Sequence, residues 1–208
     1  MTNSIARAVR TRLAPALTYD DATRLLRRFP RDIRLRDGSK LRMRQLCFDD
    51  REPLAAFFAR CSPEAIRYRF LSPMTSISDS LLDYLADIDG SRHVALILTQ
   101  READEEMIVA EGRYVVFDER PAVADIAFLV ADEMRRRGIA TLLIDELISI
   151  ACGNGVTHFS VDVLADNRAM LSLLRKTGLA RSGTISSGVI HFETPILCSE
   201  AVKAKIAA

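Results

Sequence analysis

A run of basic and small residues, Arg135-Arg136-Arg137-Gly138-Ile139-Ala140-Thr141, has the composition of an anion-binding loop. It follows an apolar run that ends at Ala131 and opens a stretch whose apolar residues have helical spacing. Small side chains at 138 and 140 let a ligand approach the backbone, and the first N–H groups of a helix lack intrahelical partners. The helix dipole and the arginines add positive charge. The loop therefore predicts a diphosphate site, and it leaves open which arginines face the ligand.

The same loop excludes two other phosphate-binding motifs. It lacks the lysine of G-x-x-x-x-G-K-[ST] and the additional glycine of G-x-G-x-x-G, so neither a nucleoside triphosphate nor a dinucleotide fits well. Taken alone, the loop is also compatible with a plain helix start that follows a basic turn. The helices and strands on either side of the loop are needed to distinguish these interpretations.

The flanking segments alternate between strand-like and helix-like patterns. Residues 33–44 alternate apolar and charged side chains around Asp37-Gly38, which predicts a hairpin. Apolar spacing and capping residues predict helices over residues 50–60, 62–70, 78–87, 138–152 and 167–176. Strands are predicted over residues 93–99, 107–117, 122–131, 159–164 and 189–194. The first three of these strands are expected to form an antiparallel meander.

The N-terminal end of the chain is strongly basic. Residues 1–44 contain 12 Lys/Arg and 4 Asp/Glu, whereas the whole chain has a net charge of only +1. Residues 1–31 are predicted to be a helical extension, with helices over 3–13 and 20–29, and the main domain is expected at 32–208. The basic end is compatible with nucleic acid, acidic lipid or a transit peptide. A solvated helical face is favoured, because no aromatic residues are interleaved for stacking on nucleic acid.

The cysteines and histidines argue against a metal site. Neither residue type shows the paired spacing that would bring two ligands to one ion; the residues are Cys47, Cys61, Cys152, Cys198, His93, His158 and His191. No apolar run approaches the roughly 18 residues that a membrane span requires. We therefore expect a soluble, cytoplasmic protein without a metal.

Four segments together resemble the GCN5-related N-acetyltransferase (GNAT) family. They are the opening strand pair from Arg36 to Arg44, Ser62-Pro63-Glu64 followed by Tyr68-Arg69-Phe70, the loop at 135–141, and Asn167-x-x-Met170-Leu171 leading to Gly178-Leu179. All lie in family order between Asp32 and Thr194. The flanking segments are most similar to bacterial protein lysine acetyltransferases that modify acyl-coenzyme A synthetases. Some of those proteins carry an additional module, which residues 1–31 could not contain.

The resemblance implies an α+β fold with α/β/α layers, in which helices cover both faces of a mixed, mostly antiparallel sheet. It implies that the family's fourth and fifth strands, here the strands predicted over residues 122–131 and 159–164, splay apart to admit acetyl-coenzyme A. The pyrophosphate would bind the loop residues Arg135, Arg136, Arg137, Gly138, Ile139, Ala140 and Thr141. Backbone groups near Leu129 and Val130, and the side chain of Asn167, would contact the pantetheine arm. Asn167 is also expected to cap a helix, and both roles can coexist.

The resemblance also implies a general base, since a lysine amine has a pKa near ~10.4 and must lose a proton. The family subgroup has a glutamate ten residues before the loop signature, whereas this chain has Asp125. Its shorter side chain would work through a bridging water or not at all. Glu111 is the reserve candidate. Leu174 occupies the position at which many members have a tyrosine acid, so protonation of the leaving thiolate is unassisted.

These features predict transfer of an acetyl group from acetyl-coenzyme A to an amine within a ternary complex. A protein lysine, for example on an acyl-coenzyme A synthetase, is the first choice of acceptor. A small amine is the second. A coenzyme A-binding module with little catalysis is a third hypothesis, because Asp125 and Leu174 depart from the family pattern. Self-association into a homodimer is left open.

Overall fold

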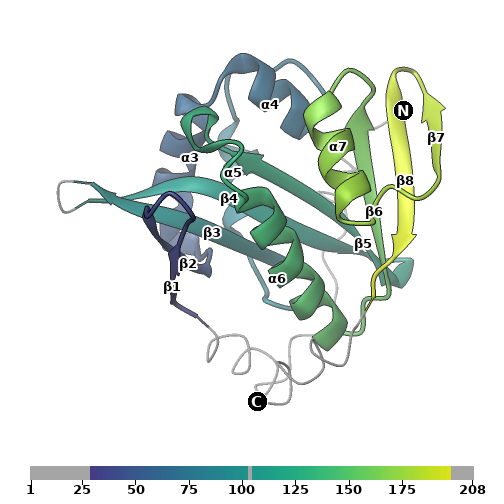
Figure 1. Cartoon of the computed structure of the whole chain (residues 1–208), viewed down its shortest axis with the longest axis horizontal. Coiled ribbons are helices and arrows are strands. Elements are labelled where there is room, and N and C mark those ends of the chain that lie inside the picture. Colours follow the sequence, from purple (N-terminus) through teal and green to yellow (C-terminus); the bar gives the residue numbers. More distant parts are fainter. Residues whose placement is uncertain (1–28, 103–104, 198–208) are drawn as a thin grey trace.

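An eight-stranded sheet forms the centre of the computed structural model, which describes residues 29–102 and 105–197 (Figure 1). The strands are β1 (Arg31–Arg34), β2 (Lys40–Gln45), β3 (His93–Glu102), β4 (Glu105–Phe117), β5 (Arg120–Val130), β6 (His158–Leu164), β7 (Gly183–Ser186) and β8 (Val189–Pro195). Their order across the sheet is β1-β2-β3-β4-β5-β6-β8-β7, and only β5 and β6 are parallel neighbours. The expected hairpin and meander are thus confirmed.

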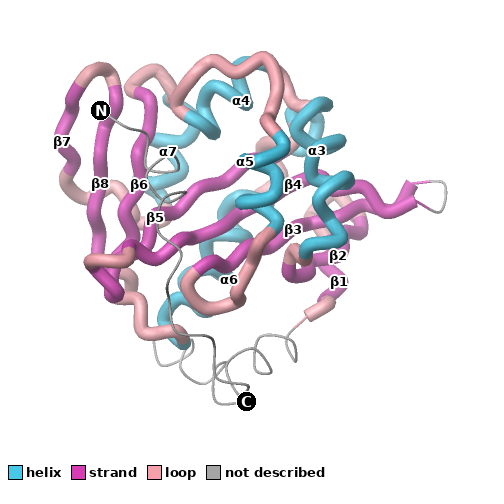
Figure 2. The backbone as a smooth tube through the Cα atoms, turned by 180° about the vertical axis from the view of Figure 1, so that it is seen from behind, coloured by secondary structure: helices cyan, strands magenta, loops and turns pink. Residues whose placement is uncertain are grey.

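Helices cover both faces of this sheet. They are α3 (Arg51–Arg60), α4 (Pro63–Phe70), α5 (Asp79–Ala86), α6 (Ile139–Gly153) and α7 (Arg168–Lys176). Figure 1 shows α6 and α7 in front of the sheet, and Figure 2, from behind, shows α3, α4 and α5 on the opposite face. The layered α+β fold is therefore as expected. No helix among residues 29–102 and 105–197 is long and apolar enough to span a membrane.

Local sequence signals set most helix boundaries. Ser62 caps α4 by accepting a hydrogen bond from the N–H of Ala65, and Pro63 occupies the first helical position, where no N–H is needed. Ser78 caps α5 through the N–H of Leu81 in the same way. One strand, β7, was not predicted because all four of its residues are exposed and show no alternation. The helices expected over 3–13 and 20–29 lie outside the described residues, except for Phe29.

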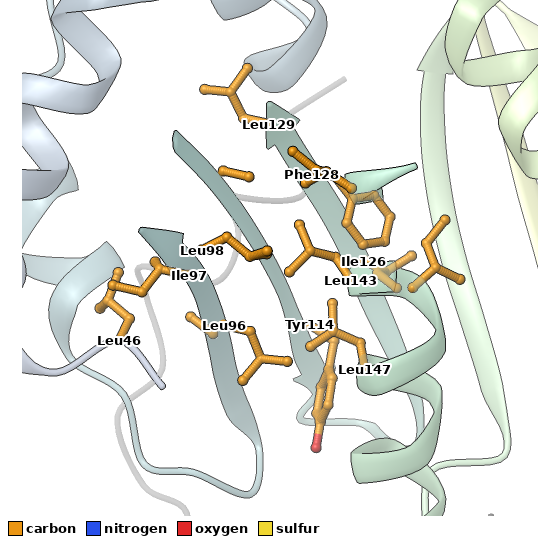
Figure 3. Close-up of a cluster of buried hydrophobic side chains, with 14 of the residues drawn as sticks. Leu46, Leu96, Ile97, Leu98, Tyr114, Ile126, Phe128, Leu129, Leu143 and Leu147 are labelled. Atoms are coloured by element: carbon orange, nitrogen blue, oxygen red, sulfur yellow. The ribbon is translucent and has the colours of Figure 1, made fainter. Parts of the chain in front are cut away.

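Apolar core residues lie on both faces of the sheet, and Figure 3 shows Ile126, Phe128, Leu143 and Leu147 in the layer between α6 and the central strands. Gly112 on β4 is what lets the helix approach. A Cβ atom there would lie 2.9 Å from Cδ1 of Phe128 and 3.3 Å from both Cβ of Leu143 and Cδ1 of Leu147. The helix that begins at the arginine-glycine loop is thus packed tightly on the strands that precede it.

Candidate active site

The sheet opens between its two parallel strands. Only Val123, Ala124 and Asp125 of β5 pair with β6, although β5 continues to Val130. Beyond Asp125, the described chain provides no strand neighbour for β5 on its β6 side, whereas β6 pairs with β8 along its whole length. The result is the splay expected between these strands. We call this opening the splayed gap, and Asp125 marks its vertex.

Backbone groups of β5 alternate between the splayed gap and β4. The N–H of Thr157 donates to the carbonyl of Ala122 at 2.8 Å, so the backbone N–H and C=O groups of even-numbered β5 residues point toward β6. The N–H of Ala131 donates to the carbonyl of Val109 at 2.9 Å, so the backbone N–H and C=O groups of odd-numbered residues point toward β4. The peptide groups of Phe128 and Val130 therefore face the splayed gap. Those of Leu129 face β4, opposite Glu111.

The loop at 135–141 has the shape of an anion cradle. Gly138 precedes α6 with φ +84° and Arg136 has φ +61°, so two left-handed residues curl the chain before the helix begins. Open space surrounds the position of a Cβ at Gly138. The first-turn N–H groups of a 15-residue helix are available to a ligand there. These features fit a diphosphate group of the kind that coenzyme A carries.

The three arginines of the loop have different partners. Nη2 of Arg135 lies 2.9 Å from Oδ1 of Asp132, and Nη1 of Arg137 lies 3.0 Å from Oδ2 of Asp37 in the β1–β2 turn. Arg136 is exposed and has no ion pair within the described part of the chain. Arg136 is therefore the loop arginine best able to bind a ligand anion.

We expect Arg136→Ala to weaken acetyl-coenzyme A binding about tenfold, the effect of losing one charge-assisted hydrogen bond. Arg135→Ala and Arg137→Ala should have smaller effects because carboxylates of the protein already occupy those side chains. Isothermal titration calorimetry on the three variants measures the difference. Equal losses in all three would contradict the assignment.

Asp125 lies on the sheet face covered by α4 and α5. Cross-strand pairing aligns it with Val115 on β4 and His93 on β3, so the three side chains share this face. Asp125 is half-buried. The ring of Tyr84, from α5, stacks on the His93 imidazole with the centroids 5.2 Å apart. Burial raises the pKa of Tyr84, and the nearby charge of Asp125 adds to that rise although Arg113 opposes it.

A buried charge network lies beside this row of residues. Glu111 is fully buried, its Oε1 accepts a hydrogen bond from Nε of Arg113, and its Oε2 lies 3.4 Å from Nη2 of Arg69 on α4. Arg113 also donates to the carbonyl of Leu85 on α5 at 2.9 Å. Burial lowers the pKa of His93 to about 3, so its imidazole is neutral and Nε2 accepts from Nη1 of Arg113 at 2.9 Å. The network joins α4, α5, β3 and β4.

These contacts favour a structural role for Glu111. Both of its carboxylate oxygens are engaged by guanidinium groups and none of its surface reaches solvent, so a substrate proton has no direct route to it. Asp125 is more accessible and stands at the vertex of the splayed gap. The geometry thus supports Asp125 over the reserve residue as the proton acceptor.

Glu111→Gln should lower the free energy of unfolding by about 3 kcal/mol, because it leaves two buried guanidinium groups without their carboxylate. Urea denaturation measures this loss. The matched control is Glu193→Gln, which removes a carboxylate from the exposed pair with Arg120. We expect a much smaller loss there, and equal losses would contradict the structural role of Glu111.

The remaining expected residues occupy distinct positions. Asn167 is buried and caps α7, since its Oδ1 accepts a hydrogen bond from the N–H of Met170 at 3.0 Å. Leu174 is fully buried in the core, where it cannot donate a proton. Sequence reasoning assigned no role to Arg113 or Tyr84. A signal existed for Arg113, because it lies two residues from Glu111 in an otherwise apolar run and must share its face.

Comparison with known proteins agrees with this geometry. The family model described as the Acetyltransferase (GNAT) family matches residues 42–179. The chain belongs to the GNAT family. It is an acetyltransferase of the acyltransferase class.

Two curated GNAT proteins illustrate the similarity. Acetyltransferase PA5475 of Pseudomonas aeruginosa is 34% identical over 160 residues, which cover 76% of this chain and 85% of that protein. Acetyltransferase Pat of Mycolicibacterium smegmatis is 28% identical over 178 residues, which cover 86% of this chain. The chain spans only 49% of the length of Pat.

Solved structures show the same GNAT fold. The GNAT domain of S. lividans PAT superposes with a TM-score of 0.72 at 28% identity, covering 80% of this chain and 96% of that one. The yncA structure from Salmonella typhimurium, described as a putative acetyltransferase with its cofactor acetyl-CoA, has a TM-score of 0.58 at 13% identity and covers 77% and 96% of the two chains. The resemblance to GNAT domains of bacterial Pat proteins is thereby confirmed.

Proposed function

We propose that this GNAT enzyme transfers acetyl groups from acetyl-coenzyme A to lysine side chains of a protein, with Asp125 as the proton acceptor. The observation that carries the proposal is the position of Asp125 as the last β5 residue paired with β6. A half-buried carboxylate stands there at the vertex of the gap, on the face lined by α4 and α5. The resemblance to bacterial protein lysine acetyltransferases supports a protein acceptor.

Residues of this chain would hold acetyl-coenzyme A at three points. Arg136 and the first N–H groups of α6 suit the pyrophosphate, and the peptide groups of Phe128 and Val130 are directed into the gap that would receive the pantetheine amides. The buried Asn167 stands at the start of α7. Acetyl-coenzyme A supplies an activated thioester, so the protein has to position the amine and remove its proton.

Proton removal is the chemical task left to Asp125. A lysine ammonium with a pKa near ~10.4 is almost fully charged at neutral pH, and a positioned carboxylate can take its proton directly or through water. The aspartate is one methylene shorter than the glutamate of the related subgroup, which favours the route through water. Tyr84, stacked on His93, lies near enough to Asp125 for the carboxylate charge to add to the rise that burial causes in the pKa of Tyr84.

A transfer assay with radiolabelled acetyl-coenzyme A tests the proposal. The protein is incubated with an acyl-coenzyme A synthetase or with a panel of amino acids and polyamines, and mass spectrometry locates the product. Acetylation of a protein lysine is expected. If the radiolabel were found only on a small amine, the acceptor would be a small molecule and not a protein lysine. Tight coenzyme A binding without transfer to any acceptor would leave a binding module and overturn the proposal.

A further inference from the structure

A hollow of about 580 Å³ lies over β1, β2 and β3, away from the splayed gap. Four cationic side chains line it, Arg34, Lys40, Arg42 and Arg101, together with Asp32 and Glu106. All four cations are exposed. We call this site the basic hollow.

Among the described residues, no carboxylate forms an ion pair with the cations of the basic hollow, although the charge of Arg42 helps to lower the pKa of Glu106. None of the four forms an ion pair within residues 29–102 and 105–197, whereas many other arginines of the same region do, Arg51, Arg92 and Arg120 among them. Glu106 is held by Arg44, whose Nε lies 3.2 Å from its Oε1, and by the Thr99 hydroxyl, which donates to the same oxygen at 2.5 Å. Exposed positive charge thus exceeds the negative charge available to neutralise it.

The basic hollow lies at a distance from the splayed gap. Thr99 of the hollow pairs with Ile108 on β4, and Val115 farther along β4 pairs with Asp125. At about 3.4 Å per residue, the seven residues from 108 to 115 separate the two sites by roughly 24 Å along the sheet. A molecule that occupies both sites must be long, as a protein chain is.

We propose that the basic hollow binds an acidic segment of the acceptor protein. This inference rests on the proposed function, in which the acceptor is a protein. Charge complementarity between the four cations and acidic side chains supplies the attraction. The lining offers no aromatic ring for nucleobase stacking, which favours a peptide over a single-stranded nucleic acid.

Fluorescence anisotropy with labelled hexaglutamate tests the basic hollow without acetyl-coenzyme A. The double variant Arg42→Glu/Arg101→Glu should weaken hexaglutamate binding by about tenfold or more, since two attractions become repulsions. The matched control is Arg175→Glu/Arg181→Glu, which reverses two exposed arginines outside the hollow and should bind as the wild type does. Hexaglutamine should not bind. Equal hexaglutamate affinity in the two double variants would overturn the proposal, as would tighter binding of a single-stranded oligonucleotide through the same arginines.

A variant that binds hexaglutamate more tightly than the wild type distinguishes an effect on binding from a loss of folding, because a misfolded protein would bind less tightly. Asp32→Asn removes a negative charge from the lining and should tighten hexaglutamate binding about twofold. Unchanged or weaker binding would count against the hollow. Acetylation of a short lysine peptide without acidic residues should be equal in all these variants. That assay reports on the proposed function alone, so failure of either proposal is recognised separately.

Discussion

Gly138→Asp should abolish measurable acetyl-coenzyme A binding, with an increase in the dissociation constant of at least about 100-fold. The glycine has φ +84° directly before α6, and its missing side chain leaves open space at the helix start. An aspartate there would set a negative charge against the diphosphate where the helix dipole otherwise attracts it, and like-charge contacts cost several kcal/mol. Calorimetric titration with acetyl-coenzyme A measures the loss.

Gly155→Asp provides a matched control for this change. Gly155 has φ +79°, and no atom lies within 4 Å of its would-be Cβ, so its substitution imposes the same backbone strain of about 1 kcal/mol. It lies just beyond the other end of α6, away from the loop. Both variants should lose similar stability, but Gly155→Asp should still bind. If Gly138→Asp bound acetyl-coenzyme A normally, the assignment of the donor loop would be wrong.

Asp125→Asn should reduce kcat about 10²- to 10³-fold while leaving acetyl-coenzyme A affinity unchanged. An amide has nearly the shape of the carboxylate but cannot accept the amine proton, and positioned general bases contribute within this range. The residual rate should rise with pH, because the uncharged fraction of an amine with pKa near ~10.4 grows as pH increases. Steady-state kinetics between neutral and alkaline pH measure both effects.

Two further variants test whether the loss of turnover is specific to the Asp125 carboxylate. Asp118→Asn removes a carboxylate from the turn of the β4–β5 hairpin, where Asp118 pairs with Arg92, and should leave turnover unchanged. Asp125→Glu restores the longer side chain of the related subgroup and should match or exceed the wild-type rate. Normal turnover in Asp125→Asn would refute the proton-acceptor assignment. The buried Glu111 would then require a proton route that its contacts do not provide.

The loop at 135–141 could be predicted as a donor site from sequence because its signals are local. Gly138 and Ala140 lie within one helical turn of the arginines, so composition and spacing alone indicate an anion site. The loop could not indicate which arginine is available. The availability of Arg137 depends on Asp37, which lies about 100 residues earlier in the chain and pairs with it. No sequence pattern around either residue predicts this contact.

The charge network shows the same limit on the other face of the sheet. The alternation of Glu111 and Arg113 predicts that the two side chains share a face, but their burial and their contact with Arg69 on α4 depend on how a helix packs. The sequence ranked Glu111 as a reserve base, and its enclosure by two guanidinium groups favours a structural role. Tyr84 became relevant only because α5 stacks it on His93.

The sequence by itself determined the order of the helices and of every strand except β7, the anion-binding composition of the loop at 135–141 and the family resemblance, because each depends on residues that are close along the chain. Tertiary structure decided where the sheet opens, which β5 peptide groups face the gap, and which carboxylate remains accessible. It also gathered Arg34, Lys40, Arg42 and Arg101 into one hollow. These features depend on strand register and helix packing between distant segments, which periodicity does not encode.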